Sequence, residues 1–299
     1  MAGTTRQLSG APATLPMMLK AALPVVPGVG SLPGVRRAGD ALPDLTLVRK
    51  GVPLDRDHVA AYAEVCGFGL KETVPLTYPH MLAFALHMAI MTDGDFPFPA
   101  MGMVHLENTI TQHRAIGAGE TLDVSARPTD LRPHPKGMLF DIVTDVHANG
   151  ELVWEETTTL LRRGRSHDDA APSPLADLET VPGTGTTWRL PADLGRSYAA
   201  VSGDHNPIHL YPLTAKALGF KRQIAHGMWT KARSLAALEG RLPDAVRVDV
   251  AFKKPVFLPS TLAFGSRAVE HGAKRPDYDF ALTSAKNGAP HLVGRTRAL

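Results

Sequence analysis

An acid, an amide and an imidazole are crowded around a proline in the stretch YAAVSGDHNPIH, residues 198–209. Asp204 and His209 are five positions apart, and Asn206 and Pro207 lie between them. A histidine titrates near neutral pH, and a nearby carboxylate raises the basicity of an imidazole. If the proline holds the turn rigid, both side chains can hydrogen-bond one water, and such a pair contributes about 10²–10⁴ in rate. The stretch therefore predicts acid–base chemistry on water.

The same stretch is compatible with two other kinds of site, and both fit less well. His205 and His209 have the spacing of metal-binding pairs on helices, but Pro207 disfavours a regular helix there and no third soft ligand is nearby. Ser202 lacks the Gly-x-Ser-x-Gly elbow of a serine hydrolase, because the residues around it read Ala-Val-Ser-Gly-Asp. We therefore predict a site without a metal.

The chain contains one pattern twice. YAEVCG at 62–67 resembles YAAVSG at 198–203, YPHM at 78–81 corresponds to AHGM at 225–228, and HRAIGAGETLDVSA at 113–126 parallels KKPVFLPSTLAFGSRA at 253–268. DIVTDVHANG and FALTSAKNG then match in the same order. Matches that keep one order at nearly one offset indicate two copies of one fold. Because the Asp-x-Asn-Pro-x-His group occurs only in the second copy, we predict one site per chain, in the C-terminal half.

Each copy has the elements needed to position such a loop. A short helix (55–66 and 193–202) precedes a more apolar helix (80–91 and 226–239), and the first apolar helix has almost no polar face, so it must be buried. Strand-like runs rich in Val, Thr and aromatics follow, at 103–114, 121–129, 138–147 and 152–161, and again at 246–257, 261–270, 277–286 and 291–298. Asn-Gly pairs at 149–150 and 287–288 favour tight hairpins. We expect an antiparallel sheet curled around one helix in each copy, with the sheet edges of the two copies paired into a pseudo-dimer.

The chain divides at a segment of linker composition. Residues 162–187 are rich in Pro, Gly, Ser, Thr and charge, and separate a first copy at 40–161 from a second copy at 188–299. Residues 1–39 are interrupted by Pro16, Pro24, Pro27 and Pro33, and predict an irregular N-terminal arm. The predicted order is arm, first copy without the site, linker, and second copy with the site.

Composition bounds the function classes. A formal charge of +3 with no basic runs does not support binding to nucleic acid. No window reaches the apolar length of a membrane span, so stable membrane insertion is not expected. The single cysteine, Cys66, forms no intrachain disulfide and fits a reducing cytoplasm.

The stretch YAAVSGDHNPIH, followed by GFKRQIAHGM, resembles the signature of the MaoC-like (R)-specific enoyl-CoA hydratases and 3-hydroxyacyl-thioester dehydratases, and the two copies resemble the tandem double-hotdog members of that family. The resemblance implies an α+β fold in which each half is an antiparallel sheet wrapped around a central helix. It implies a hydro-lyase that adds water to a trans-2-enoyl thioester or removes it from an (R)-3-hydroxyacyl thioester. No cofactor is implied, and the substrate is carried by coenzyme A or by an acyl carrier protein.

The resemblance also assigns roles to residues. It makes Asp204 and His209 the catalytic dyad, and it places the backbone N–H of Gly227, at the start of the second central helix, against the thioester carbonyl. A helix N-terminus suits that task because it offers free N–H groups and partial positive charge. Asn206 contacts the substrate or locks the loop, and Ser202, Gly203 and Pro207 shape the loop.

Two other functions stay open at this stage. A thioesterase of this fold carries its working carboxylate on or beside the central helix, and HGMWTKARSLAALEG has no acid before Glu239. An acyl-binding module without catalysis would explain why the first copy lacks the site. The sequence leaves open the acyl chain length, the carrier, the direction, the proton-transfer roles within the dyad and the assembly of a homodimer. His226 is expected to be a packed or capping imidazole.

Overall fold

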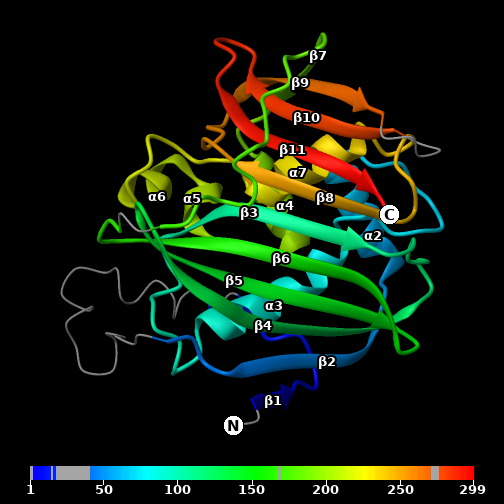
Figure 1. The fold of residues 1–299 in the computed structure, drawn as a ribbon, viewed down its shortest axis with the longest axis vertical. Helices are drawn as coiled ribbons and strands as arrows, with labels where there is room; N and C mark the ends of the chain where they lie inside the picture. The colour runs from blue at the N-terminus through cyan, green and yellow to red at the C-terminus, as the bar shows by residue number, and fades with distance from the viewer. Residues whose placement is uncertain (1–2, 15, 18–40, 168–169, 271–275) are drawn as a thin grey trace.

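The computed structural model of the protein describes residues 3–14, 16–17, 41–167, 170–270 and 276–299. Its strands form one eleven-stranded sheet, in the order β1-β2-β4-β5-β6-β3-β8-β11-β10-β9-β7 (Figure 1). The strands are β1 (Thr4–Gln7), β2 (Leu45–Pro53), β3 (Met103–Gln112), β4 (Thr121–His134), β5 (Gly137–Ala148), β6 (Glu151–Arg163), β7 (Thr186–Leu190), β8 (Val246–Phe252), β9 (Ser260–Val269), β10 (Asp277–Ser284) and β11 (Pro290–Ala298). The helices are α2 (Arg56–Cys66), α3 (Pro79–Met91), α4 (Leu194–Ser202), α5 (Pro207–Leu210), α6 (Pro212–Ala217) and α7 (Gly227–Ala236).

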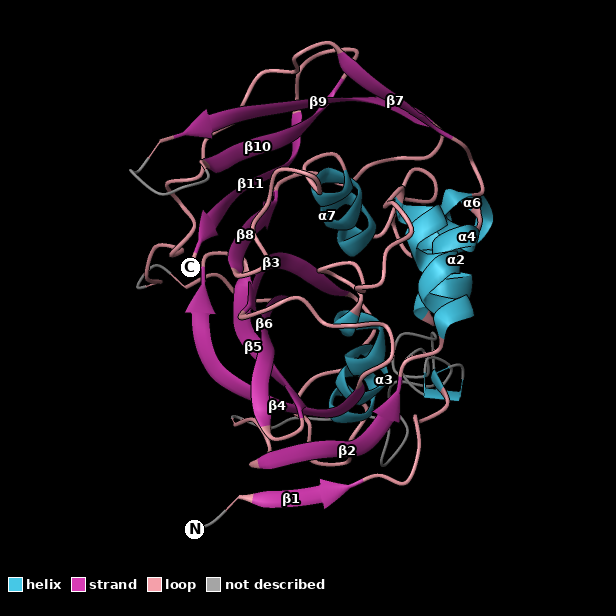
Figure 2. Cartoon of the chain, turned by 90° about the vertical axis from the view of Figure 1, so that its right-hand side faces the viewer, coloured by secondary structure: helices cyan, strands magenta, loops and turns pink. Residues whose placement is uncertain are grey.

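The sheet is strongly curved and encloses the two central helices. Figure 2 shows α3 and α7 on its concave side, with α2, α4 and α6 beyond them. Helix α3 buries residues all around its circumference, as its apolar sequence requires. Pro79 lies in the first turn of α3, where its missing N–H has no helical acceptor to lose.

The two halves are related by the order of their strands. The N-terminal half contributes β2-β4-β5-β6-β3 and the C-terminal half contributes the mirror order β8-β11-β10-β9-β7. The halves meet where β3 pairs antiparallel with β8, with Asn108 opposite Val250 and Ile110 opposite Val248. The predicted α+β fold, with two antiparallel sheets joined edge to edge around two helices, is confirmed.

The structure adds elements that the sequence patterns did not reveal. β2 and β7 each precede the helices of their half and extend its sheet to five strands. β8 ends at Phe252, so Lys253 and Lys254 lie in the loop after it and not on the predicted strand. The strands and helices that were predicted are present, with ends that shift by a few residues.

The N-terminal arm and the linker differ from their predicted descriptions. Residues 4–7 form a regular strand, β1, which pairs parallel with β2, so the prediction of a wholly irregular arm at 1–39 is wrong for this part. Residues 1–2, 15 and 18–39 of the arm lie outside the described residues. β6 extends into the predicted linker as far as Arg163, and β7 begins within it at Thr186. Between these strands, Leu175 and Val181 pack on the outer face of the sheet against Ala251, Ala281 and Val293.

In the described ranges, no helix combines the length and the apolar character that crossing a membrane would require.

Candidate active site

The loop that carries Asp204 and His209 begins where α4 ends. Gly203 caps α4 in a left-handed conformation, with φ of 72°, and its N–H donates to the carbonyl of Ala199 at 2.9 Å. Glycine adopts this conformation without the strain that a side chain would bring. The N–H of Asp204 then donates to Oγ of Ser202 at 3.2 Å. Ser202 and Gly203 therefore turn the chain and aim Asp204, as loop-shaping residues would.

A one-turn helix, α5, carries the other half of the loop. The side chain of Asn206 caps it by accepting from the N–H of Ile208 at 3.4 Å, and Pro207 occupies the first turn. Proline is tolerated at this first helical position. His205 lies before the helix, so no regular helix carries both His205 and His209, as the position of Pro207 predicts. Asp204 Oδ1 accepts from the N–H of Asn206 at 3.1 Å. Asn206 and Pro207 thus fix the spacing between Asp204 and His209.

Gly195 is a residue of the site that sequence analysis missed. It lies in α4, and a Cβ added to it would stand 2.0 Å from the carbonyl oxygen of His209. Only glycine lets α4 and α5 approach this closely. A glycine inside an otherwise helical pattern was the one available signal.

His209 is buried and held in its neutral form. Its Nδ1 donates to the carbonyl of Ile224 at 2.8 Å, which leaves Nε2 with a free lone pair. Burial lowers the pKa of His209, and the charge of Asp204 and the bond to Ile224 oppose that shift. Asp204 and His209 have ligand-type atoms within 4.8 Å of each other. The structure therefore brings the two predicted dyad residues together.

His226 packs directly on His209. The two rings stack with centroids 3.7 Å apart, and Nε2 of His226 donates to the carbonyl of Asp204 at 3.0 Å. Burial, and next the neighbouring His209, lowers the pKa of His226 to about 3, so it is neutral near pH 7. His226 holds the ring of His209 and the backbone of Asp204 in place, in keeping with the packed imidazole that was predicted.

Gly227 is the first residue of α7, directly after His226. The N–H groups of a first helical turn have no acceptor within their own helix, and this end of the helix carries partial positive charge. A Cβ on Gly227 would stand 3.2 Å from the Phe252 ring. The absence of a side chain therefore leaves the N-terminus of α7 open to the cavity beside Asp204 and His209.

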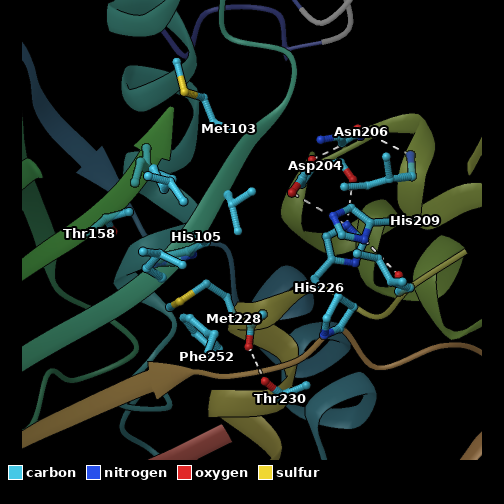
Figure 3. A pocket seen from close by; sticks show the side chains of 18 of the residues that line it. Met103, His105, Thr158, Asp204, Asn206, His209, His226, Met228, Thr230 and Phe252 are labelled. Carbon is cyan, nitrogen blue, oxygen red and sulfur yellow. Dashed lines mark hydrogen bonds and ion pairs between the residues drawn. The ribbon is translucent and has the colours of Figure 1, made fainter. Parts of the chain in front are cut away.

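A cavity of about 560 Å³ joins these groups and extends into the N-terminal half. Asp204, Asn206, His209 and Gly227 line it on one side. Figure 3 shows His105 and Thr158 on the wall opposite Asp204 and His209. Much of the remaining lining is methionine, at Met81, Met88, Met91, Met101, Met103 and Met228. Methionine is flexible and apolar, so this cavity suits an aliphatic group of variable shape.

A second polar cluster lies at the inner end of the cavity, between the halves. Nδ1 of His80 donates to Glu156 at 2.8 Å, and Nδ2 of Asn108 donates to the other oxygen of Glu156 at 2.8 Å. Nζ of the fully buried Lys231 donates to Oδ1 of Asn108 at 2.5 Å. Burial lowers the pKa of Lys231 to about 7. Burial alone would raise the pKa of Glu156, but the neighbouring His80 holds it well below its usual range.

Two groups of described residues bring three metal-ligand atoms within 4.8 Å of one another: Asp204 with His209 and His226, and His80 with His87 and Glu156. In the second group both oxygens of Glu156 already accept hydrogen bonds, and Nε2 of His87 is bonded to Thr144 at 2.7 Å. In the first, Nε2 of His226 donates to the backbone carbonyl of Asp204 at 3.0 Å. A metal would have to displace these bonds.

The buried histidines make folding sensitive to acid. Burial lowers the pKa of His87 to about 4, and those of His105 and His226 to about 3. Between about pH 6.5 and pH 4 the unfolded chain therefore binds more protons than the folded one, and the free energy of unfolding falls with pH by about 1.4 kcal/mol per pH unit for each such histidine. We expect the urea midpoint to drop steeply across this window. His113→Gln, at a partly exposed histidine, should keep the drop, and a constant midpoint would contradict the expectation.

Comparison with known proteins finds a matching family model and several similar sequences. The sequence profile described as "MaoC like domain" matches residues 173–284. The 3-hydroxyacyl-thioester dehydratase X of Mycobacterium tuberculosis is 41% identical over 289 residues, which cover 96% of this chain and 99% of that protein. The (R)-specific enoyl-CoA hydratase of Aeromonas caviae is 32% identical over 94 residues, 30% of this chain and 68% of that protein.

Solved structures also include chains whose fold is similar to that of this chain. The crystal structure of HtdX of Mycobacterium tuberculosis matches with a TM-score of 0.73 and 40% identity, over 85% of this chain and all of that chain. A conserved hypothetical protein of the same organism, described as having a double hotdog fold, matches with a TM-score of 0.52 and 17% identity, over 83% of this chain and 94% of that chain. The second likeness concerns the fold alone.

Proposed function

The chain belongs to the MaoC-like dehydratase family and is a hydro-lyase, and from this premise we propose that it hydrates trans-2-enoyl thioesters to (R)-3-hydroxyacyl thioesters, and dehydrates them in reverse, with Asp204 and His209 acting on the water. One observation carries the proposal: the free Nε2 of a neutral His209, the carboxylate of Asp204 and the N-terminus of α7 line one cavity. A base, an acid partner and an oxyanion donor are what the addition of water requires.

In the direction of hydration, the water lies between Asp204 and Nε2 of His209. As its oxygen bonds to carbon 3, its proton passes to the dyad, and the electron pair of the double bond moves through carbon 2 to the thioester oxygen. The N–H of Gly227 and the positive end of α7 stabilise the resulting enolate. The dyad then returns a proton to carbon 2. Because the two groups interact, their protons belong to the pair.

The carrier of the acyl group is coenzyme A or an acyl carrier protein, both of which bear phosphate. Exposed Lys136, Lys253 and Lys254 line the cavity and supply positive charge where such a group would enter.

Ala100 and Met101, which belong to the segment between α3 and β3, also line the cavity. We propose that the N-terminal half, which has no second dyad, receives the acyl tail. Homodimer formation and a cytoplasmic location stay predictions from the sequence.

An assay with trans-2-enoyl-CoA substrates of short and long chain tests the reaction class. We expect loss of the conjugated thioester absorbance without release of free thiol. Free thiol would favour hydrolysis, which α7 does not support because it carries no carboxylate. Tight binding of acyl-CoA without turnover would favour a binding module.

The rate should depend on the protonation of His209. Because burial lowers its pKa from 6.5, the acid limb of kcat/KM against pH is expected to have an apparent pKa below 6.5. Asp204→Asn removes a negative charge that raises the pKa of His209. The apparent pKa of the acid limb, measured on the residual activity of this variant, should therefore be lower still. Initial rates across neutral and acidic pH measure this, and a limb above 6.5 would contradict a buried neutral base.

A further inference from the structure

The cavity has a polar wall that the addition of water does not use. His80 and His87 from α3, His105 from β3 and Thr158 from β6 line it, and we refer to these four residues as the N-terminal polar wall. All four belong to the half that lacks the dyad. An aliphatic acyl tail would need only the methionines and the aromatic rings around them.

The hydrogen bonds of this wall fix two rings and leave part of each ring uncommitted. His80 uses Nδ1 to bind Glu156, and His87 uses Nε2 to bind Thr144. Neither His80 Nε2 nor His87 Nδ1 has a hydrogen bond to a described residue. Glu156 is anchored in turn through Asn108 to Lys231. Rings held this firmly offer their second nitrogens in fixed directions.

His105 supplies an independent observation that points to a ligand. Its Nε2 is buried and has no hydrogen-bond partner among the described residues. Burial lowers the pKa of His105 to about 3, so the ring is neutral and offers both a donor and an acceptor. A buried polar atom without a partner is destabilising, and such atoms are normally satisfied by water or by a ligand.

The position of His105 relates this wall to the proposed reaction site. Its ring lies against Phe252, with centroids 4.8 Å apart, and Phe252 is the side chain that faces Gly227. One aromatic ring therefore separates His105 from the helix N-terminus that would hold the thioester carbonyl. If the acyl tail occupies this cavity, a group bound at His105 would lie on the acyl part of the substrate, beyond the carbons at which water is added.

We propose that the N-terminal polar wall binds a second oxygen on the acyl chain, a hydroxyl or keto group beyond carbon 3, so that the protein prefers acyl thioesters carrying such a group over plain chains of equal length. This inference rests on the proposed function, because it takes the acyl tail to lie in this cavity. A hydroxyl both donates and accepts, so it can bond to neutral His105 whichever nitrogen carries the proton. A site built for hydrogen bonds discriminates against an analogue that leaves its groups unpaired.

The test compares ten-carbon trans-2-enoyl-CoA substrates that carry a single hydroxyl or keto group at successive positions from carbon 5 outward with the unsubstituted chain. We expect kcat/KM to be about tenfold higher for the best oxygenated substrate, as one or two neutral hydrogen bonds allow. His105→Phe, which keeps a planar ring, should abolish the preference, and His105→Gln, which keeps a donor and an acceptor, should restore part of it. Leu160→Met, a volume-conserving change at a cavity-lining residue opposite His105 and outside the polar wall, should change kcat/KM for both substrates in parallel.

No preference at any position in the wild-type protein would overturn the proposal. So would a His105→Phe variant that lowers kcat/KM equally for both substrates, because that result indicates a structural role. Binding of saturated ten-carbon acyl-CoA, with and without the oxygen, separates this proposal from the proposed function. Preferential binding without turnover would support the polar wall and refute the hydration, whereas turnover without preference would do the reverse.

Discussion

Asp204→Asn is expected to lower kcat for the hydration of a trans-2-enoyl-CoA by about 10²–10⁴, the range of general acid–base catalysis. Asparagine keeps the oxygen that accepts from the N–H of Asn206, so the loop should hold its conformation. What is lost is the negative charge beside His209. His209→Gln should cost a similar factor, because it removes the free Nε2 from the cavity.

The double variant distinguishes a dyad from two independent residues. If Asp204 and His209 act on one water, the double variant should lose little more than either single variant, since groups that act as a unit are not additive. His205→Gln is the matched control, because His205 lies between them in sequence and, among the described residues, its ring bonds to the carbonyl of Gly203. Unfolding midpoints would verify that each variant folds. Full activity in either single variant would contradict the assignment.

Gly227→Pro is expected to lower kcat by about 10²–10³, the usual effect of removing one oxyanion donor. Proline deletes the N–H and nothing that the helix needs, because it is tolerated at the first helical position. The preceding residue must be extended, and His226 already is, with φ of −65° and ψ of 139°. This position therefore permits a backbone donor to be removed by mutation.

Gly227→Ala is the control for the added bulk. Its Cβ would stand 3.2 Å from Phe252, as the Cβ of proline would, but alanine keeps the N–H. The ratio of kcat between the alanine and proline variants thus measures the effect of losing the N–H apart from that of the added Cβ. Equal kcat values for the two variants would show that the N–H of Gly227 does not stabilise the transition state.

The elements that position the site were predictable because their signals are local. The apolar run of α3, the Asn-Gly hairpins and the repeated Tyr-Ala-x-Val of α2 and α4 each act within a short window. Edge-to-edge pairing of the two halves followed from the open edge that each would otherwise leave, and the structure identifies β3 and β8 as the strands that meet. The proximity of Asp204 and His209 was predictable as well, because a single turn joins them.

The remaining features depend on contacts between distant residues. β7 is five residues long and mostly exposed, so it has no clear apolar alternation. The network of His80, Asn108, Glu156 and Lys231 joins four separate elements from both halves. Within its own segment, each of these residues is an ordinary polar residue with no local signal of the network. Only the fold brings them together.

The most direct test of the proposed mechanism is the stereochemistry of hydration of crotonyl-CoA. We predict that the wild-type protein forms (R)-3-hydroxybutyryl-CoA, and that the Asp204→Asn and His209→Gln variants form it at rates lower by the factors given above. An (S)-product, or undiminished formation of the product by both variants, would contradict the account of Asp204 and His209 as the pair that acts on water.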